Sequence, residues 1–177
     1  MIQKKFNNVI IELDGGNIVD QPDCDAIVNA ANAQLQIGGG VAGAIHRIGD
    51  PELTEETRSL APITPGEAVI TSAPNFPNSH IIHCLGPVYG RDKPADQLLR
   101  NCYVNALKIA DENELESIAF PAISTGAFGY PMEQAAKIAL TAVKELSIDL
   151  EHIKTVRFVL WGQNAFDVHA DMLEKIS

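Results

Sequence analysis

The chain is poor in cysteine. It has three cysteines among 177 residues, Cys24, Cys84 and Cys102. The count is odd and no two are spaced as C-x-x-C, so neither a disulfide framework nor a four-ligand zinc site is expected. We expect three small, mostly buried side chains in a reducing compartment.

Positive charge is scarce as well. The chain carries 13 Lys and Arg against 23 Asp and Glu, a net charge of −10 at pH 7. A protein this acidic gains little from counterion release on DNA or RNA, and anionic membranes repel it. We therefore expect neither bulk nucleic-acid binding nor membrane binding. A small anion held by backbone N–H groups is still allowed, because such a site needs no positive side chain.

Long apolar segments and repeats are also missing. No stretch approaches the ~18 apolar residues of a membrane span, and the two lysines near the N-terminus have no apolar run behind them, so no signal peptide is expected. With 46% hydrophobic residues, the composition is that of a globular protein. The sequence predicts one domain over residues 1–177, located in the cytoplasm.

The periodic segments alternate between strand and helix patterns. Strands are predicted at residues 9–13, 26–30, 68–72, 80–85, 117–121 and 155–161, and helices at residues 41–48, 52–60, 96–113, 132–146 and 165–176. This alternation is typical of an α/β fold with a mixed or largely parallel sheet covered on both faces. In such folds, ligands bind beyond the carboxyl ends of the strands.

Glycines lead into a helix shortly after one of these strands. The strand at residues 26–30 is followed by a turn with Asn29 and Asn32, and then by Gly38, Gly39 and Gly40. Glycines let a backbone approach a ligand closely, and the start of a helix has unpaired N–H groups. The segment therefore indicates a cradle for an anion.

A second segment with this organisation follows the strand at residues 117–121. Ser124, Thr125 and Gly126 begin a loop that ends at Pro131, a residue favoured at the first position of a helix. Backbone N–H groups and two hydroxyls cluster there. Two such loops at one edge of a sheet are suited to hold a diphosphate from both sides.

Other nucleotide and hydrolase motifs fit poorly. Gly38, Gly40 and Gly43 match G-x-G-x-x-G, but about seven residues separate them from the strand and the acidic residue of the dinucleotide fingerprint is missing. No Gly-Lys-Ser/Thr P-loop occurs. Ser124 lacks the first glycine of a nucleophile elbow and has no identifiable base. His80 and His83 are three apart on a strand and face opposite sides, which argues against a shared metal.

The ordered motifs VNAAN (28–32), GGGVAGAIH (38–46), HIIHCLGP (80–87) and SIAFPAISTGAFGYP (117–131), followed by a terminal strand ending in an aromatic, resemble the macrodomain family. The resemblance covers nearly the whole chain. It implies a three-layer α/β/α sandwich with a mixed, largely parallel central sheet that binds ADP-ribose. Many members remove ADP-ribose from protein carboxylates or deacetylate O-acetyl-ADP-ribose.

The resemblance also implies a role for each matching position. Asn32 would hold the distal ribose hydroxyls as the catalytic residue, Phe128 would lie against the same ribose, and Trp161 would stack on adenine. Asn17 stands where the family usually has an aspartate that accepts from the adenine amino group. The implied ligand-binding set is Asn17, Ile18, Ala30, Gly38, Gly39, Gly40, Val41, Ala42, Ser124, Thr125, Gly126, Ala127, Phe128, Trp161 and Asn164.

Ala42 is a second departure, because a hydrolytic branch of the family has an aspartate there. Other branches carry alanine and can hydrolyse, so Ala42 removes a carboxylate base without removing catalysis. His46, one helical turn away, is the nearest titratable side chain by sequence. The expected function is mono-ADP-ribosyl hydrolysis or O-acetyl-ADP-ribose deacetylation, with no cofactor or metal and with ADP-ribosylated proteins as partners. The alternative is a reader module that binds ADP-ribose without turnover.

Overall fold

A computed structural model describes all residues, 1–177, in seven strands and five helices. In chain order these are β1 (Ile2–Phe6), β2 (Val9–Gly15), β3 (Ala26–Ala30), α1 (Gly40–Gly49), α2 (Glu52–Thr57), β4 (Ala68–Ser72), β5 (His80–Cys84), α3 (Ala95–Glu112), β6 (Ser117–Phe120), α4 (Met132–Leu146), β7 (Thr155–Leu160) and α5 (Gln163–Lys175). None of these helices has both the length and the apolar character needed to cross a bilayer.

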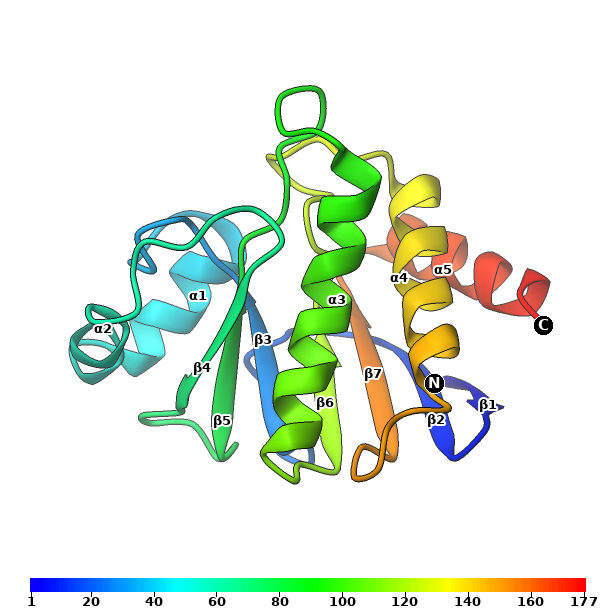
Figure 1. Cartoon of the computed structure of the whole chain (residues 1–177), viewed down its shortest axis with the longest axis horizontal. Coiled ribbons are helices and arrows are strands. Elements are labelled where there is room, and N and C mark those ends of the chain that lie inside the picture. The colour runs from blue at the N-terminus through cyan, green and yellow to red at the C-terminus, as the bar shows by residue number, and fades with distance from the viewer.

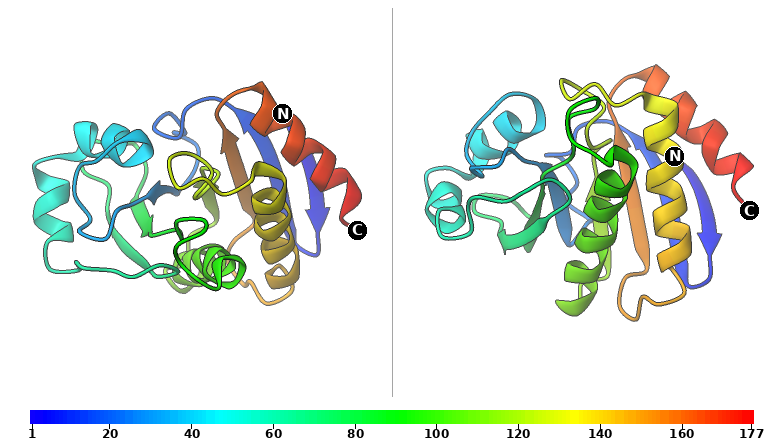
Figure 2. Two further views of the ribbon diagram at one scale, coloured as in Figure 1. Left: turned by 90° about the horizontal axis from the view of Figure 1, so that it is seen from above. Right: turned by 45° about the horizontal axis from the view of Figure 1, so that its top comes forward.

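The strands form one sheet in the order β1-β2-β7-β6-β3-β5-β4. The pairs from β2 to β5 are parallel, while β1 and β4 pair antiparallel with their neighbours at the two edges. Helices cover both faces of the sheet (Figures 1 and 2). The predicted α/β fold, a three-layer α/β/α sandwich with a mixed, largely parallel sheet, is therefore confirmed.

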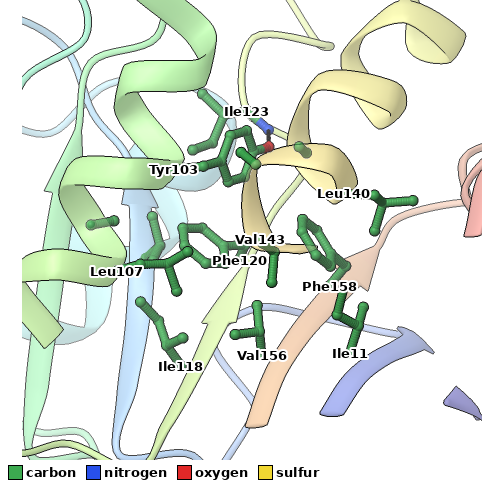
Figure 3. Packing of buried hydrophobic residues seen from close by; sticks show 14 of the residues in the cluster. Ile11, Tyr103, Leu107, Ile118, Phe120, Ile123, Leu140, Val143, Val156 and Phe158 are labelled. Carbon is green, nitrogen blue, oxygen red and sulfur yellow. Dashed lines mark hydrogen bonds between the residues drawn. The ribbon is translucent and has the colours of Figure 1, made fainter. Parts of the chain in front are cut away.

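Each face of the sheet packs on its own apolar cluster. The larger cluster joins the sheet to α3, α4 and α5, and a smaller one lies on the face toward α1 and α2. In the larger cluster, Tyr103 of α3 packs against Phe120 and Phe158, with ring centroids 5.0 and 6.0 Å away (Figure 3). Burial stabilises each such ring by about 2–3 kcal/mol. This packing fixes the carboxyl ends of β6 and β7.

The structure differs from the predicted elements mainly at one strand and one helix, while other ends shift by one or two residues. The sequence pattern missed β1, which pairs with β2 through a tight hairpin with Asn7 in a left-handed conformation (φ 55°). The polar residues of β1 hid its strand character, because an edge strand buries little of its surface. The second helix was predicted to extend to residue 60 but ends at Thr57, whose buried hydroxyl donates to the carbonyl of Leu35.

Candidate functional site: a cavity at the carboxyl edge of the sheet

The main cavity lies beyond the carboxyl ends of four neighbouring parallel strands, β2, β7, β6 and β3. It has a volume of about 700 Å³, within the range that holds a nucleotide-sized ligand. Adjacent strands are about 4.8 Å apart, so the cavity spans about 14 Å from β2 to β3. Its shape therefore favours an elongated ligand lying across the strand ends.

The first glycine loop forms one wall, at the start of α1. Gly39 is the N-cap residue, and Gly40 adopts a left-handed φ of 55° that a side chain would strain. The backbone N–H groups of Gly39, Gly40, Val41 and Ala42 donate to no group of the protein. They and the helix dipole provide a partial positive charge without a basic side chain.

The loop after β6 forms the facing wall. The N–H groups of Ser124, Gly126, Ala127 and Phe128 also lack acceptors within the protein. The two hydroxyls expected to cluster beside them are engaged elsewhere: Ser124 donates to the carbonyl of Pro87 at 2.8 Å and Thr125 to that of Ala122 at 2.7 Å. This wall therefore offers backbone N–H groups to a ligand. The two hydroxyl groups instead donate to backbone carbonyls and stabilise the loop.

Internal contacts hold this second loop in place. The Tyr103 hydroxyl accepts a hydrogen bond from the Ile123 N–H at 3.1 Å, which ties the start of the loop to α3. Ser124 has a left-handed φ of 67°, a strained conformation for a residue with a side chain. Its hydroxyl bond to the chain at Pro87 compensates for this strain. The loop is therefore fixed before any ligand arrives.

The β2–β7 end of the cavity carries an aromatic ring. Trp161 follows β7 and is 80% exposed, although it lines the cavity. Asn17 and Ile18 follow the adjacent strand β2 and line the same end, because Gly15 pairs with Leu160 at the last step of the ladder. An exposed indole beside an amide and an aliphatic side chain is suited to a planar heterocycle.

Asn32 lies at the opposite end, after β3. Its side-chain N–H donates to the carbonyl of Gln36 at 2.8 Å, and its oxygen accepts from the Gln36 N–H at 3.1 Å. An asparagine amide offers two donors and an acceptor with two lone pairs. One N–H and one lone pair therefore stay available toward the cavity while the other two shape the loop before Gly38.

The cavity wall contains no Asp, Glu, His, Lys, Arg or Cys side chain. His46, the nearest titratable candidate by sequence, is fully buried outside the wall with Nδ1 3.1 Å from both carboxylate oxygens of Asp50. His83 is buried too, between Asn29 and Thr71, and burial lowers its pKa to about 3. The protein therefore supplies no strong acid or base at the site.

The three cysteines and the pair His80 and His83 are not arranged as a metal site. Cys24, Cys84 and Cys102 are free and buried, and burial raises the pKa of Cys102 to about 12. His80 bonds to Ser79 and His83 to Asn29 and Thr71. No group of three or more His, Cys, Asp and Glu residues is arranged to hold a metal ion.

Every residue of the predicted site lines the cavity except Asn164, which is exposed in the first turn of α5. Sequence reasoning missed a set of mostly small and apolar wall residues: Gly16, Ala31, Ala44, Pro121, Ala122, Met132, Val159 and Ala165. Pro121 and Ala122 sit inside the motif that was already recognised. Met132 and Ala165 lie in the first turns of α4 and α5, and the helix pattern does not indicate that they line a cavity.

Comparison with known proteins identifies the family. The macro domain family model matches residues 28–139. A macro domain-containing protein of Caldanaerobacter subterraneus subsp. tengcongensis is 45% identical over 171 residues, covering 94% of this chain and 97% of its own length. One of Methanosarcina mazei is 44% identical over 176 residues, with 99% and 94% covered. The chain belongs to the macro domain family.

Solved structures of macrodomains have the same fold. The Oceanobacillus iheyensis macrodomain with ADP has a TM-score of 0.91 and 35% identity, covering 98% of this chain and 94% of that one. The Trypanosoma brucei macrodomain in complex with ADP-ribose has a TM-score of 0.84 and 34% identity, covering 91% and 68%. Both the fold and the family are therefore those that the sequence motifs resemble.

Proposed function

We propose that this protein, as one macrodomain over residues 1–177, binds ADP-ribose and removes it from acidic side chains of ADP-ribosylated proteins, deacetylates O-acetyl-ADP-ribose, or does both. The observation that carries the proposal is the pair of facing loops with unpaired N–H groups between Trp161 and Asn32. Related macrodomains with ADP and with ADP-ribose support the choice of ligand. The location in the cytoplasm stays a prediction of the sequence.

The ligand parts correspond to successive parts of the cavity. Adenine would stack on Trp161 beside Ile18, and the diphosphate would lie between the N–H groups of the two loops. Charge-assisted hydrogen bonds contribute about 1.5–3 kcal/mol each. These groups can offset the repulsion from the protein's net charge of −10, because salt screens that charge beyond ~8 Å. The distal ribose would then reach Asn32 and Phe128.

The proposed reaction depends on the positioning of a water molecule and on the substrate's own phosphate as the base. The cavity wall has no ionisable side chain that could act as base. A water molecule held between a phosphate oxygen and the anomeric carbon would attack that carbon and give its proton to the phosphate. The bond from the carbon to the leaving carboxylate would break. In deacetylation the same water would attack the acyl carbon and give its proton to the phosphate. The bond from that carbon to the ribose oxygen would break, and the ribose oxygen would take the proton from the phosphate. Correct positioning of the reactants can lower a barrier by ~7–11 kcal/mol.

Asn32 would orient the reacting ribose. Its two bonds to Gln36 keep the amide in one orientation, and its remaining N–H and lone pair would face the reacting end. His46 is fully buried and paired with Asp50, so it would support α1 and take no part in proton transfer.

The test is timed release of ADP-ribose from a mono-ADP-ribosylated glutamate peptide and of acetate from O-acetyl-ADP-ribose. The wild type is expected to release at least one product. Asn32→Ala should be slow, and Gln34→Ala, an exposed change in the same loop, should match the wild type. If His46→Ala abolished turnover with binding intact, a histidine base would replace the phosphate-assisted mechanism.

The second candidate function is a reader that binds ADP-ribose without turnover. Ala42, which supplies no carboxylate, and Asn17, which supplies no charge, favour this alternative. It would be correct if calorimetry showed ADP-ribose binding while neither substrate was consumed.

A further inference from the structure

A buried arginine supports the loop that forms the Trp161 end of the cavity. Arg157 lies in β7 and is 7% exposed, on the face of the sheet that also carries Val159 and Cys24. A buried guanidinium is costly unless hydrogen bonds and opposite charges surround it. Its partners therefore show which part of the chain it organises.

All but one of these partners belong to the loop between β2 and β3. Arg157 donates from Nε to Glu12 of β2 at 2.8 Å and from both Nη atoms to the carboxylate of Asp23 at 2.8 and 2.7 Å. It also donates from Nη1 to the side-chain oxygen of Gln21 at 2.9 Å. The hydrogen bond from Arg157 lowers the pKa of Asp23. Two carboxylates already balance the charge, so charge balance does not require Gln21.

Gln21 connects the arginine to the cavity wall. Its side chain is buried, and its Nε2 donates to the backbone carbonyl of Asn17 at 3.0 Å. The same carbonyl accepts from the Asp20 N–H at 3.0 Å. The Gln21 backbone is held in turn by Asn78, which donates to its carbonyl at 2.8 Å. Both ends of the Gln21 amide are thus used, one on Arg157 and one on Asn17.

This arrangement fixes the peptide group between Asn17 and Ile18. The C=O and N–H of a planar trans peptide point in opposite directions. Because two donors hold the Asn17 carbonyl, the Ile18 N–H is directed away from the buried network. That N–H donates to no group of the protein, and Ile18 lines the same end of the cavity as the exposed Trp161 ring.

We propose that Gln21, oriented by Arg157, is a positioning residue that aims the Ile18 N–H at the heterocycle of a nucleotide stacked on Trp161. The inference rests on the proposed function, because it assumes that the base lies at this end. It assigns Gln21 no contact with the ligand. Its effect is therefore confined to ligands that carry a base and absent for those that occupy the glycine loops alone.

The test compares two ligands on two variants. Gln21→Met removes both side-chain bonds, and Gln21→Glu keeps an acceptor for Arg157 but removes the donor to Asn17. Binding of ADP and of inorganic pyrophosphate is measured for each. Both variants should lose about tenfold in ADP affinity, the effect of one hydrogen bond, and keep pyrophosphate affinity within about twofold. The control is Asp25→Asn, which replaces the carboxylate that accepts from the N–H groups of Glu116 and Ser117 by a neutral amide, at the amino ends of the strands and away from the cavity.

The outcomes separate the inference from the function on which it rests. Equal losses for ADP and pyrophosphate, or a Gln21→Glu protein that binds ADP as the wild type does, would assign Gln21 a purely structural role. An Asp25→Asn protein with the same selective loss of ADP would overturn the inference too, because general destabilisation would then explain it. If the wild type bound neither ligand, the proposed function would fail and the inference with it.

Discussion

At the scale of single residues, Trp161 is the most exposed of the large hydrophobic side chains, although burial of its ring would stabilise the protein. Its ring is 80% exposed, although full burial of such a ring is worth several kcal/mol. Its neighbours at the end of β7 are buried, so the strand could have placed it inside. A ligand that covers the ring would recover this free energy.

Trp161→Ala is expected to weaken ADP-ribose binding by ~1–3 kcal/mol, the value of one base stacked on an aromatic ring. Trp161→Phe should lose much less. Because the ring is exposed, neither change should lower the free energy of unfolding by more than ~0.5 kcal/mol. Calorimetry and denaturant unfolding measure the two effects. Ile148→Ala, at a residue that is 73% exposed in the loop between α4 and β7 and outside the cavity wall, is the control. Unchanged affinity in Trp161→Ala would remove the ring from the ligand site.

Asn32→Ala is expected to leave ADP-ribose affinity within ~1.4 kcal/mol, a factor of ten, and to slow hydrolysis by ~100-fold or more. In the proposed binding mode, other groups hold the adenine and the diphosphate, while the Asn32 amide would contact the reacting ribose. Single-turnover hydrolysis beside calorimetry separates the two effects. Asn32→Asp keeps the acceptor for the Gln36 N–H, so a slow Asn32→Asp protein would show that the lost donor matters. Equal losses in binding and rate would contradict the orienting role.

At the scale of elements, α1 depends on close contact with the glycine loop before it. A Cβ on Gly43 would lie 2.4 Å from the carbonyl oxygen of Gly38, whereas a Cβ on Gly39 would meet nothing within 4 Å. The two glycines therefore serve different purposes. Gly43 allows the loop to pack on the helix, and Gly39 leaves the cavity wall open.

Gly43→Ala is expected to lower the free energy of unfolding by ~1–3 kcal/mol, the usual cost of overpacking, and to displace the loop. Gly39→Ala should leave stability within ~0.5 kcal/mol but weaken ADP-ribose binding, because its methyl group would enter the space proposed for the diphosphate. Thermal unfolding of both variants measures the change in stability, and calorimetry measures the change in ADP-ribose affinity. The reverse order of stabilities would show that the loop does not pack as described.

The elements that were predicted correctly from the sequence are more buried and more periodic than the strand that was missed. The buried central strands and the amphipathic helices α3, α4 and α5 have strong periodicity, and the structure places them where the pattern did. Edge strand β1 was missed because most of its residues face solvent. Within the site, motif residues could be placed from their order, but the support given by Arg157 and Gln21 depends on contacts across more than 130 residues. The bonds of the Ser124 and Thr125 hydroxyls to backbone carbonyls likewise depend on tertiary structure.

At the scale of the whole molecule, buried histidines make stability depend on pH. Burial lowers the pKa of His83 to about 3, while an unfolded histidine has a pKa near ~6.5. Between these values the unfolded chain binds a proton that the folded protein does not. Stability is therefore complete above about pH 6.5 and falls as the pH drops below it. His169, whose pKa is also lowered by burial, acts in the same direction.

The free energy of unfolding is expected to fall by about 2 kcal/mol between pH 7 and about pH 5 from His83 alone. His83→Gln should lose this part of the dependence and keep the part due to His169. Urea unfolding at both pH values gives the comparison. An identical drop in the two proteins would mean that His83 is protonated without cost in the folded state.

In the proposed function, an acidic protein holds the diphosphate of ADP-ribose with backbone N–H groups and without a basic side chain. The most direct test of this central claim is a calorimetric titration with ADP-ribose at low and at physiological salt. Because the cavity wall has no basic side chain and the net charge is −10, added salt removes repulsion and leaves the short-range hydrogen bonds in place. We predict binding whose affinity changes little or rises with salt. No binding, or a steep fall in affinity with salt, would contradict the account.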